Sequence, residues 1–248
     1  MKLKIEASAQ NGAIASVAGN IVEKGVQDFD FDFAEGEFFY LFVGQGDGRV
    51  KGQSSAEYAL EHIRDSFSMG DIASESIVDD MFSQCLYIHQ QVNGVGAYLG
   101  EVEGHGCDIN GIFGDNNQGY SLAAGGGRTY IYRNGTLSQI SDPAMALGYG
   151  AEQDQADVWQ IGGELIEGDT LLVVSKAVTE YLTNEDIEDI LYLSNYPADH
   201  ILAEAEQEGM SKNTPAAVVA AKVGGADFRE LDPNYDYEQS DSKYDAWA

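Results

Sequence analysis

Segments with strand-type and helix-type periodicity follow one another in blocks, and this order constrains the fold more than any other feature of the chain. Apolar residues recur with a period of two over residues 2–10 and 27–33, and residues 37–44, EFFYLFVG, are almost entirely apolar. These patterns are typical of β-strands, the last of them buried on both faces. We expect residues 27–44 to form a hairpin whose second strand is central in a sheet.

Two amphipathic helices are predicted next, over residues 54–67 and 74–92. Apolar residues recur there every three or four positions, as on one face of a helix. They are Ala56, Leu60, Ile63 and Phe67 in the first segment and Ile77, Met81, Cys85 and Ile88 in the second. We expect the two helices to pack side by side against the sheet.

The middle of the chain, residues 107–141, has the pattern of consecutive strands. Alternating apolar runs are separated by GDNNQG and by Asn134-Gly135, and Asn-Gly is the strongest short hairpin signal. We expect a β-meander over this segment.

The last third combines one strand, two helices and a final strand. Residues 162–178 indicate a turn and a buried strand, and residues 216–223, AAVVAAKV, indicate the last strand. Between them, Thr183 and Asp186 have the spacing of a capping box at a helix start, and Gly209 follows a second helical pattern as a C′ residue.

This order predicts an α+β fold, because two antiparallel sheets with helices on their outer faces would bury every apolar stripe. We expect one domain over residues 1–223. From residue 224 the periodicity is lost and the chain becomes acidic and aromatic. The tail over residues 224–248 is therefore expected to be extended and either solvated or docked on a partner through residues typical of interfaces. The candidates for docking are Tyr235, Tyr237, Tyr244 and Trp247.

The charge of the chain excludes some partners and favours others. The sequence has 42 acidic and 13 basic residues and a net charge of −29, which repels nucleic acids and anionic membranes. We expect a protein partner with a basic surface, although a halophilic or marine source would explain the same acidity. The sequence contains no run of 18 apolar residues, so it predicts no membrane insertion. Cys85 and Cys107 form no disulfide framework or metal motif. We therefore expect a soluble protein of the cytoplasm or another intracellular compartment.

Five stretches carry motifs of one known family, in the order in which that family has them. They are GVQDFDF (25–31), YLFVGQGDGRVKG (40–52), AAGGGRTYIYRNGTLSQIS (123–141), LIEGDTLLVVSKAVTEYLTNEDI (165–187) and GMSKNTPAAVVAAKV (209–223). Together they resemble the metal-dependent protein phosphatases of the PPM, or type 2C, family. The resemblance implies an α-β-β-α four-layer sandwich and hydrolysis of phosphomonoesters by two Mg²⁺ or Mn²⁺ ions held by carboxylates.

The residues at the family's metal-binding positions are mostly not carboxylates in this chain. The resemblance puts Gln45 at the aspartate that bridges both metals, followed by Gly46, whose backbone carbonyl serves in the family. It puts Lys176 at the aspartate of the Ser-Asp-Gly motif, and Lys212 and Asn213 at the terminal Asp-Asn pair.

The triple glycine at residues 125–127 falls in the strand that resembles the family's Gly-Asp-Ser-Arg motif. Gly126 and Gly127 replace the aspartate and the serine, whereas Arg128 and Tyr130 are kept. A glycine run can bind phosphate, but no helix follows to direct its N-terminus at an anion. Close packing inside the sandwich is the alternative explanation.

Asp28 is the residual acidic ligand that the resemblance retains, and Asp47 takes this role instead if the alignment shifts by one residue. A hard divalent ion binds poorly to an amide and is repelled by an ammonium group. Replacing two carboxylates by Lys176 and Lys212 changes the site by about four charge units, and these ammonium groups could pair with the remaining acids. We therefore expect no metal cofactor.

Three functions remain open at this point. The favoured one is a catalytically inactive pseudophosphatase that binds a protein, as a regulatory or structural subunit of a larger assembly. The second is a divergent Mn²⁺- or Mg²⁺-dependent serine/threonine phosphatase with a rearranged site of acidic residues. That site would use Asp28 and Asp47 with Asp30 or Asp115. The third is a phosphate-binding module that uses Arg128, Lys176 and Lys212.

Overall fold

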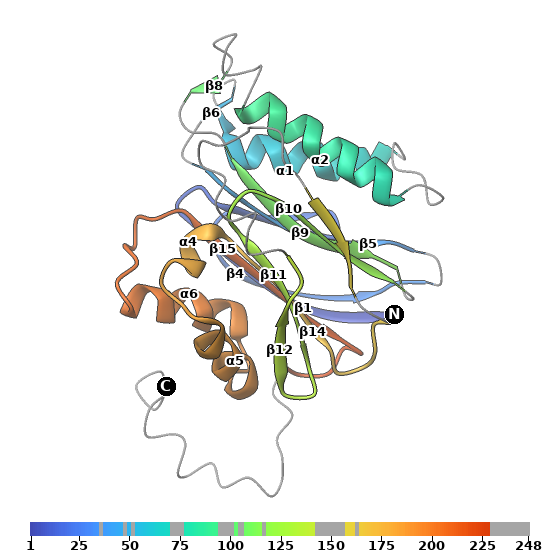
Figure 1. Cartoon of the computed structure of the whole chain (residues 1–248), viewed down its shortest axis with the longest axis vertical. Helices are drawn as coiled ribbons and strands as arrows, with labels where there is room; N and C mark the ends of the chain where they lie inside the picture. Colours follow the sequence, from blue (N-terminus) through green and yellow to red (C-terminus); the bar gives the residue numbers. More distant parts are fainter. Residues whose placement is uncertain are drawn as a thin grey trace, which may run out of the picture.

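The structure of this chain is a computed structural model, which describes residues 1–34, 37–46, 49–50, 53–69, 77–93, 102–103, 107–115, 118–141, 157–161 and 164–228. In these residues two six-stranded sheets lie face to face, and helices cover both outer faces (Figure 1). All strand pairs within the two sheets are antiparallel. The predicted α-β-β-α four-layer sandwich is confirmed.

The first sheet, here called sheet A, has the strand order β12-β11-β14-β15-β1-β4. In that order the strands are Thr136–Gln139, Arg128–Arg133, Thr170–Val174, Ala216–Val223, Lys2–Gln10 and Gly25–Asp32. Its outer face is covered by α4 (Lys176–Thr179), α5 (Asn184–Leu193) and α6 (Pro197–Gln207).

The second sheet, sheet B, has the order β13-β10-β9-β5-β2-β3. These strands are Asp157–Gln160, Gly119–Ala124, Asp108–Gly114, Phe39–Gln45, Ile14–Val17 and Asn20–Val22. The predicted helices cover it as α1 (Ser55–Met69) and α2 (Ile77–Asn93). A small third sheet joins β7 (Gln53–Ser54), β6 (Arg49–Val50) and β8 (Val102–Glu103).

Three apolar clusters fill the spaces between the four layers. One lies between the sheets and includes Ile5, Leu41 and Val219; the second joins sheet B to α1 and α2; the third joins sheet A to α4, α5 and α6. Both faces of β5 are buried, as its nearly continuous apolar sequence predicts.

The predicted hairpin over residues 27–44 is wrong. β4 pairs with β1 in sheet A, whereas β5 pairs with β2 and β9 in sheet B. β5 is central, as expected, but its predicted neighbour belongs to the other layer. A period of two predicts a strand and its buried face, and it does not say which strand lies next to it.

The meander over residues 107–141 is also divided between the two sheets. The β9–β10 and β11–β12 hairpins form as predicted, and Asn134 (φ 52°) and Gly135 (φ 77°) have the positive angles of a type I′ turn. β10 and β11, however, lie in different sheets. Residues 125–127 carry the chain from one sheet to the other.

The predicted helix ends are confirmed, and one short helix is new. Thr183 and Asp186 form the capping box of α5, and Gly209 follows α6 with a φ of 112°. The strand predicted to reach residue 178 ends at Val174, and α4 follows it.

The chain remains packed a few residues beyond the predicted domain end. Phe228 is buried in the cluster between sheet A and its helices. Tyr235, Tyr237, Tyr244 and Trp247 lie outside the described residues. No helix in the described ranges is both long and apolar enough to span a membrane.

Candidate functional site

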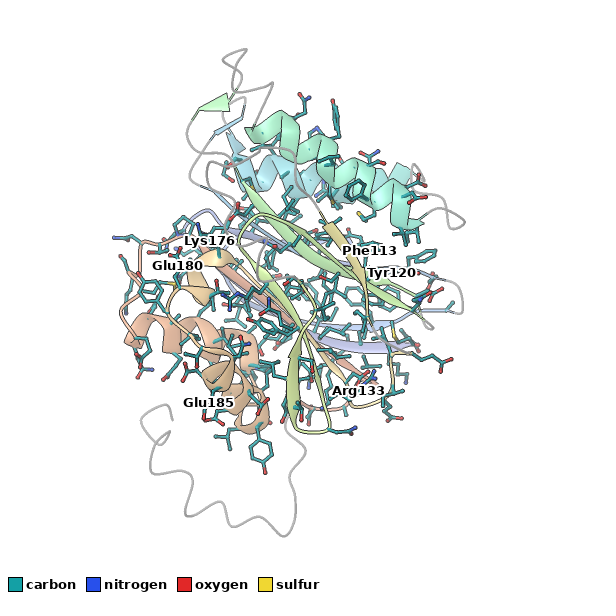
Figure 2. All side chains as sticks on the ribbon, in the orientation of Figure 1. Phe113, Tyr120, Arg133, Lys176, Glu180 and Glu185 are labelled. Carbon is teal, nitrogen blue, oxygen red and sulfur yellow. The ribbon has the colours of Figure 1, made fainter. Side chains whose placement is uncertain are left out.

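Residues from both sheets meet at one end of the sandwich. Gln45, the last residue of β5, pairs directly with Asp108, the first residue of β9. Lys176 begins α4 after β14 of sheet A. Figure 2 shows Lys176, the first residue of α4, near Glu180, the residue that follows this helix, while Arg133 lies at the other end of sheet A. We call Gln45, Asp108, Lys176 and residues 125–127 the sheet-end site.

Gln45 connects sheet B to the first turn of α4. Its side-chain Oε1 accepts a hydrogen bond from the backbone N–H of Ala177 at 2.9 Å. Ser175, the N-cap residue of α4, provides no side-chain hydrogen bond to the start of this helix. Gln45 therefore satisfies one of the N–H groups that a helix start leaves without an intrahelical partner.

Asp108 is a buried carboxyl group at the centre of the site. Its side chain accepts a hydrogen bond from Gly126 N at Oδ2, 3.1 Å away. Burial raises the pKa of Asp108, and the Gly126 N–H and the Lys176 cation oppose this rise because both favour the charged form. Lys176 thus provides positive charge near a buried acid.

The crossing glycines make room for these side chains. A Cβ atom on Gly126 would lie 2.6 Å from Lys176 Cδ, and one on Gly127 would lie 2.6 Å from Asn110 Cγ. Asn110 also binds both backbone groups of Gly127: its amide nitrogen donates to the carbonyl at 3.2 Å and its amide oxygen accepts from the N–H at 3.3 Å. Close packing, the second explanation for this glycine run, is confirmed.

Lys176 extends from the buried acid toward solvent. Its side chain is 23% exposed, and its ammonium nitrogen lies 3.8 Å from Glu180 Oε1 one turn further along the chain. An exposed pair at this spacing contributes little to stability. Lys176 therefore has two carboxyl groups nearby, the exposed one of Glu180 and the buried one of Asp108.

The three cations proposed for phosphate binding have different surroundings. Arg128 lies beside the Tyr130 hydroxyl, and its positive charge opposes the rise that burial causes in the Tyr130 pKa. Lys212 is 86% exposed, with its ammonium nitrogen 4.0 Å from Glu206 Oε2. Asn213 is exposed beside it. Arg128 directly follows residues 125–127 and pairs with Val174 of β14, so it lies next to the sheet-end site, whereas the Lys212 side chain projects into solvent.

The acidic residues of the phosphatase alternative are also spread over the molecule. Asp28 and Asp30 are exposed in β4 at the edge of sheet A. Asp115 follows the opposite end of β9 from Asp108 and accepts a hydrogen bond from Gln118 N at 2.9 Å. Asp47 lies outside the described residues.

The side chains of the sheet-end site do not fit a two-metal centre. Mg²⁺ and Mn²⁺ need several anionic oxygen ligands, and the site offers one carboxyl, an amide oxygen already bound to Ala177, and an ammonium group. Across the described ranges, no group of three or more His, Cys, Asp and Glu side chains could hold a metal ion.

Asp108 was not predicted as a site residue. It directly precedes the run INGIFG, and every residue of β9 is buried. A carboxyl inside an apolar strand is the sequence signal that could have identified it, because an acid is rarely fully buried without a specific partner.

Solved structures with the same fold were identified, although no protein-family model matches the sequence and no curated protein matches it. PppA, described as a key regulatory component of the T6SS in Pseudomonas aeruginosa, is 16% identical, with a TM-score of 0.59 over 87% of this chain and 99% of that one. The Mycobacterium tuberculosis serine/threonine phosphatase PstP/Ppp is 16% identical, with a TM-score of 0.60 over 90% and 99%. The S. agalactiae serine/threonine phosphatase is 16% identical, with a TM-score of 0.63 over 88% and 99%. The chain therefore has the fold of the PPM-type serine/threonine phosphatases.

Proposed function

We propose that this chain is a pseudophosphatase that works by binding another protein, as a regulatory or structural subunit of a larger assembly. One observation carries this proposal: the side chains of the sheet-end site are engaged in internal contacts, and Gln45 and Lys176 are not acidic. Gln45 binds Ala177 N, and the Lys176 side chain packs against Gly126 near Asp108.

Electrostatics makes this arrangement unfavourable for metal ions. A divalent cation at the site would meet the Lys176 ammonium group and would have to compete with a backbone N–H for the Gln45 oxygen. Among the described residues of the site Asp108 is the one carboxyl, and burial already disfavours its charged form. The side chains stabilise one another without an ion.

A regulatory role agrees with one of the structural neighbours, because PppA is described as a key regulatory component of its secretion system. The net charge of −29 favours a partner with a basic surface. The aromatic residues Tyr235, Tyr237, Tyr244 and Trp247 remain candidates for contact with it.

The test is an assay of phosphomonoester hydrolysis with Mn²⁺ and with Mg²⁺, combined with calorimetric titration of Mn²⁺. We expect turnover at the level of the buffer and no Mn²⁺ binding at the sheet-end site. Metal-dependent turnover that Asp28→Ala or Asp108→Ala abolishes would overturn the proposal and support the divergent phosphatase.

A variant that restores carboxylates is the matched positive control. Gln45→Asp combined with Lys176→Asp places two carboxyl groups beside Asp108, so that we expect Mn²⁺ to bind this variant and not the wild type. The Asp28→Asn variant, at the edge of sheet A, should leave the Mn²⁺ titration of both proteins unchanged. Phosphate binding by the wild type that Lys176→Ala abolishes, without hydrolysis, would instead support the phosphate-binding module.

A further inference from the structure

β4 is an edge strand of sheet A, and this edge has no strand partner among the described residues. Six of its eight residues are exposed, and the other two, Phe29 and Phe31, are half-buried. An exposed edge of this length is a template on which another chain can add a strand.

The ladder between β1 and β4 determines which backbone groups point outward. Phe33 N donates to Met1 O at 2.7 Å, and the Met1 amino group donates to Phe33 O, so the two residues form a hydrogen-bonded pair. Hydrogen-bonded and non-hydrogen-bonded pairs alternate along an antiparallel ladder, and the register runs from Lys2 with Asp32 to Ala9 with Gly25 without a break. The N–H and C=O groups of every second residue therefore point away from β1. These residues are Val26, Asp28, Asp30 and Asp32.

The side chains of the same residues make the outer face of this edge acidic. Asp28, Asp30 and Asp32 are all exposed. Their register partners in β1 are Glu6, Lys4 and Lys2, so two lysines face three aspartates and a glutamate, and Lys4 already forms a salt bridge with Asp227. The three carboxyl groups of β4 are therefore incompletely neutralised, and they lie beside the outward-pointing backbone groups.

The inner face of the edge is apolar. Phe29, Phe31 and Phe33 lie in a row, with ring centroids 6.0 Å and 5.6 Å apart. All three are partly buried against the core between the sheets. An added strand would cover the exposed sides of these rings, which favours apolar side chains at alternate positions.

We propose that the free edge of β4 binds an extended segment of a partner protein in which basic and apolar side chains alternate. The segment adds as an antiparallel strand, so that its basic residues lie opposite Asp28, Asp30 and Asp32 and its apolar residues cover the phenylalanines. This inference names the partner's chemistry and rests on the proposed function, in which the chain works by binding a protein.

Two other occupants are disfavoured by charge. A second copy would pair β4 with β4 and place aspartates opposite aspartates, which is destabilising. The tail over residues 229–248 has six acidic and two basic residues, so it carries the same sign as the edge. A basic segment avoids both conflicts.

The probe is a synthetic peptide, acetyl-KVKVKVK-amide, titrated into the full chain at low salt. We expect saturable binding, and we expect the backbone amides of residues 26, 28, 30 and 32 to become protected from hydrogen exchange. The control peptide KKKKVVV has the same composition without alternation and should bind about tenfold more weakly. Methylating the backbone nitrogen of one central lysine should have a similar effect, because the methyl group removes one hydrogen bond to β4.

Two protein variants distinguish the contribution of backbone hydrogen bonds to peptide affinity from the contribution of charge. Asp30→Pro removes an outward N–H without interrupting the bonds to β1, and we expect it to weaken binding about tenfold. Asp30→Asn should weaken binding about threefold and reduce its salt dependence, while the exposed Asp189→Asn in α5 should bind as the wild type does. If Asp30→Pro fails to fold, the methylated peptide makes the same test on the unchanged protein.

Equal binding of both peptides, or exchange protection away from β4, would overturn the inference. Either result would indicate non-specific attraction between the basic peptide and the acidic surface of the protein. A β4-mediated dimer that excludes the peptide would also overturn it. The hydrolysis assay on the same preparation tests the proposed function separately. Turnover would refute that function even with the peptide bound at β4, whereas absent turnover with failed peptide binding would refute only this inference.

Discussion

At the scale of single residues, Gln45 stabilises the contact between two elements, at a position where the PPM family that the sequence resembles has a metal ligand. Its Oε1 accepts the hydrogen bond of Ala177 N at 2.9 Å, which joins sheet B to the start of α4. The buried strand that ends at Gln45 could be predicted from the sequence. The partner of the amide could not, because the two residues are 132 positions apart.

We expect Gln45→Ala to lower the free energy of unfolding by about 1–2 kcal/mol, because the Ala177 N–H would lose its partner in a partly buried place. Denaturation in urea measures the change, and the exposed Gln207→Ala in α6 is the control. Equal stability of Gln45→Ala and the wild type would contradict this account of the amide.

Glu6 is a second residue whose role depends on the tertiary structure. It is fully buried in β1, and its Oε1 accepts a hydrogen bond from Asp199 N at 3.0 Å, at the start of α6. Its Oε2 has no hydrogen-bond partner in the described part of the chain. Burial raises the pKa of Glu6 to about 7 from 4.5, although the N–H groups of Asp199 and Ala198 oppose this rise.

The raised pKa predicts that Glu6 makes stability depend on pH. The folded protein binds this proton more tightly than the unfolded chain does, so the contribution is complete below pH 4.5 and is lost as the pH rises through about 7. Between pH 4 and pH 8 the loss is at most about 3 kcal/mol. We expect Glu6→Gln to remove this part of the pH dependence and to exceed the wild type in stability at pH 8.

Urea denaturation of both proteins between pH 4 and pH 8 provides the measurement. Glu208→Gln, which changes an exposed carboxyl at the other end of α6, should follow the wild-type curve. Parallel curves for wild type and Glu6→Gln would show that Glu6 titrates normally.

At the scale of elements, turn and cap signals predicted local structure, but they did not predict which sheet each strand belongs to. The hairpin at Asn134-Gly135 and the capping box at Thr183 both form, because each depends on backbone angles and contacts within a few residues. The pairing of β4 with β1, in contrast, joins segments separated by the β2–β3 hairpin. Local periodicity contains no information on that choice.

The β11–β12 hairpin is held to the start of β14 by a partly buried ion pair. Arg133 Nε donates to Asp169 Oδ1 at 2.7 Å, and the same guanidinium donates to Glu164 O at 2.9 Å. Asp169 also accepts from Ile166 N at 2.9 Å, and its side chain is 1% exposed. One carboxyl group therefore connects a strand end with the preceding turn.

We expect Asp169→Ala to destabilise the protein by about 2–4 kcal/mol, because it leaves the Arg133 cation and the Ile166 N–H without this acceptor. Asp65→Ala is the matched control: it removes an exposed ion pair with Arg64 and should change stability by less than about 1 kcal/mol. Similar losses for the two variants in thermal or urea unfolding would contradict the importance of burial here.

At the scale of the whole molecule, like charge acts against compaction. The net charge of −29 creates repulsion between surface carboxylates, and salt screens it over a Debye length of about 10 Å at 0.1 M. We expect the urea midpoint to rise when NaCl increases from about 20 mM to about 500 mM, with a gain of about 1 kcal/mol or more in unfolding free energy.

Potassium chloride at the same ionic strength distinguishes screening from specific ion binding, because screening depends on concentration and charge alone. The two salts should give the same midpoint. A midpoint that does not move with either salt would mean that opposite charges on the surface already balance the repulsion.

The sequence by itself determined the four long helices, most of the longer strands, their order and the four-layer class, because these follow from periodicity, turn chemistry and the need to bury apolar faces. It also located Gln45 and Lys176 through the motifs that resemble the PPM family. Only the tertiary structure decided that β4 and β5 lie in different sheets, that Asp108 lies near Lys176, and that Lys212 is exposed. The physical reason is that these relations join residues far apart in the chain, where contact depends on how the layers pack and not on any local pattern.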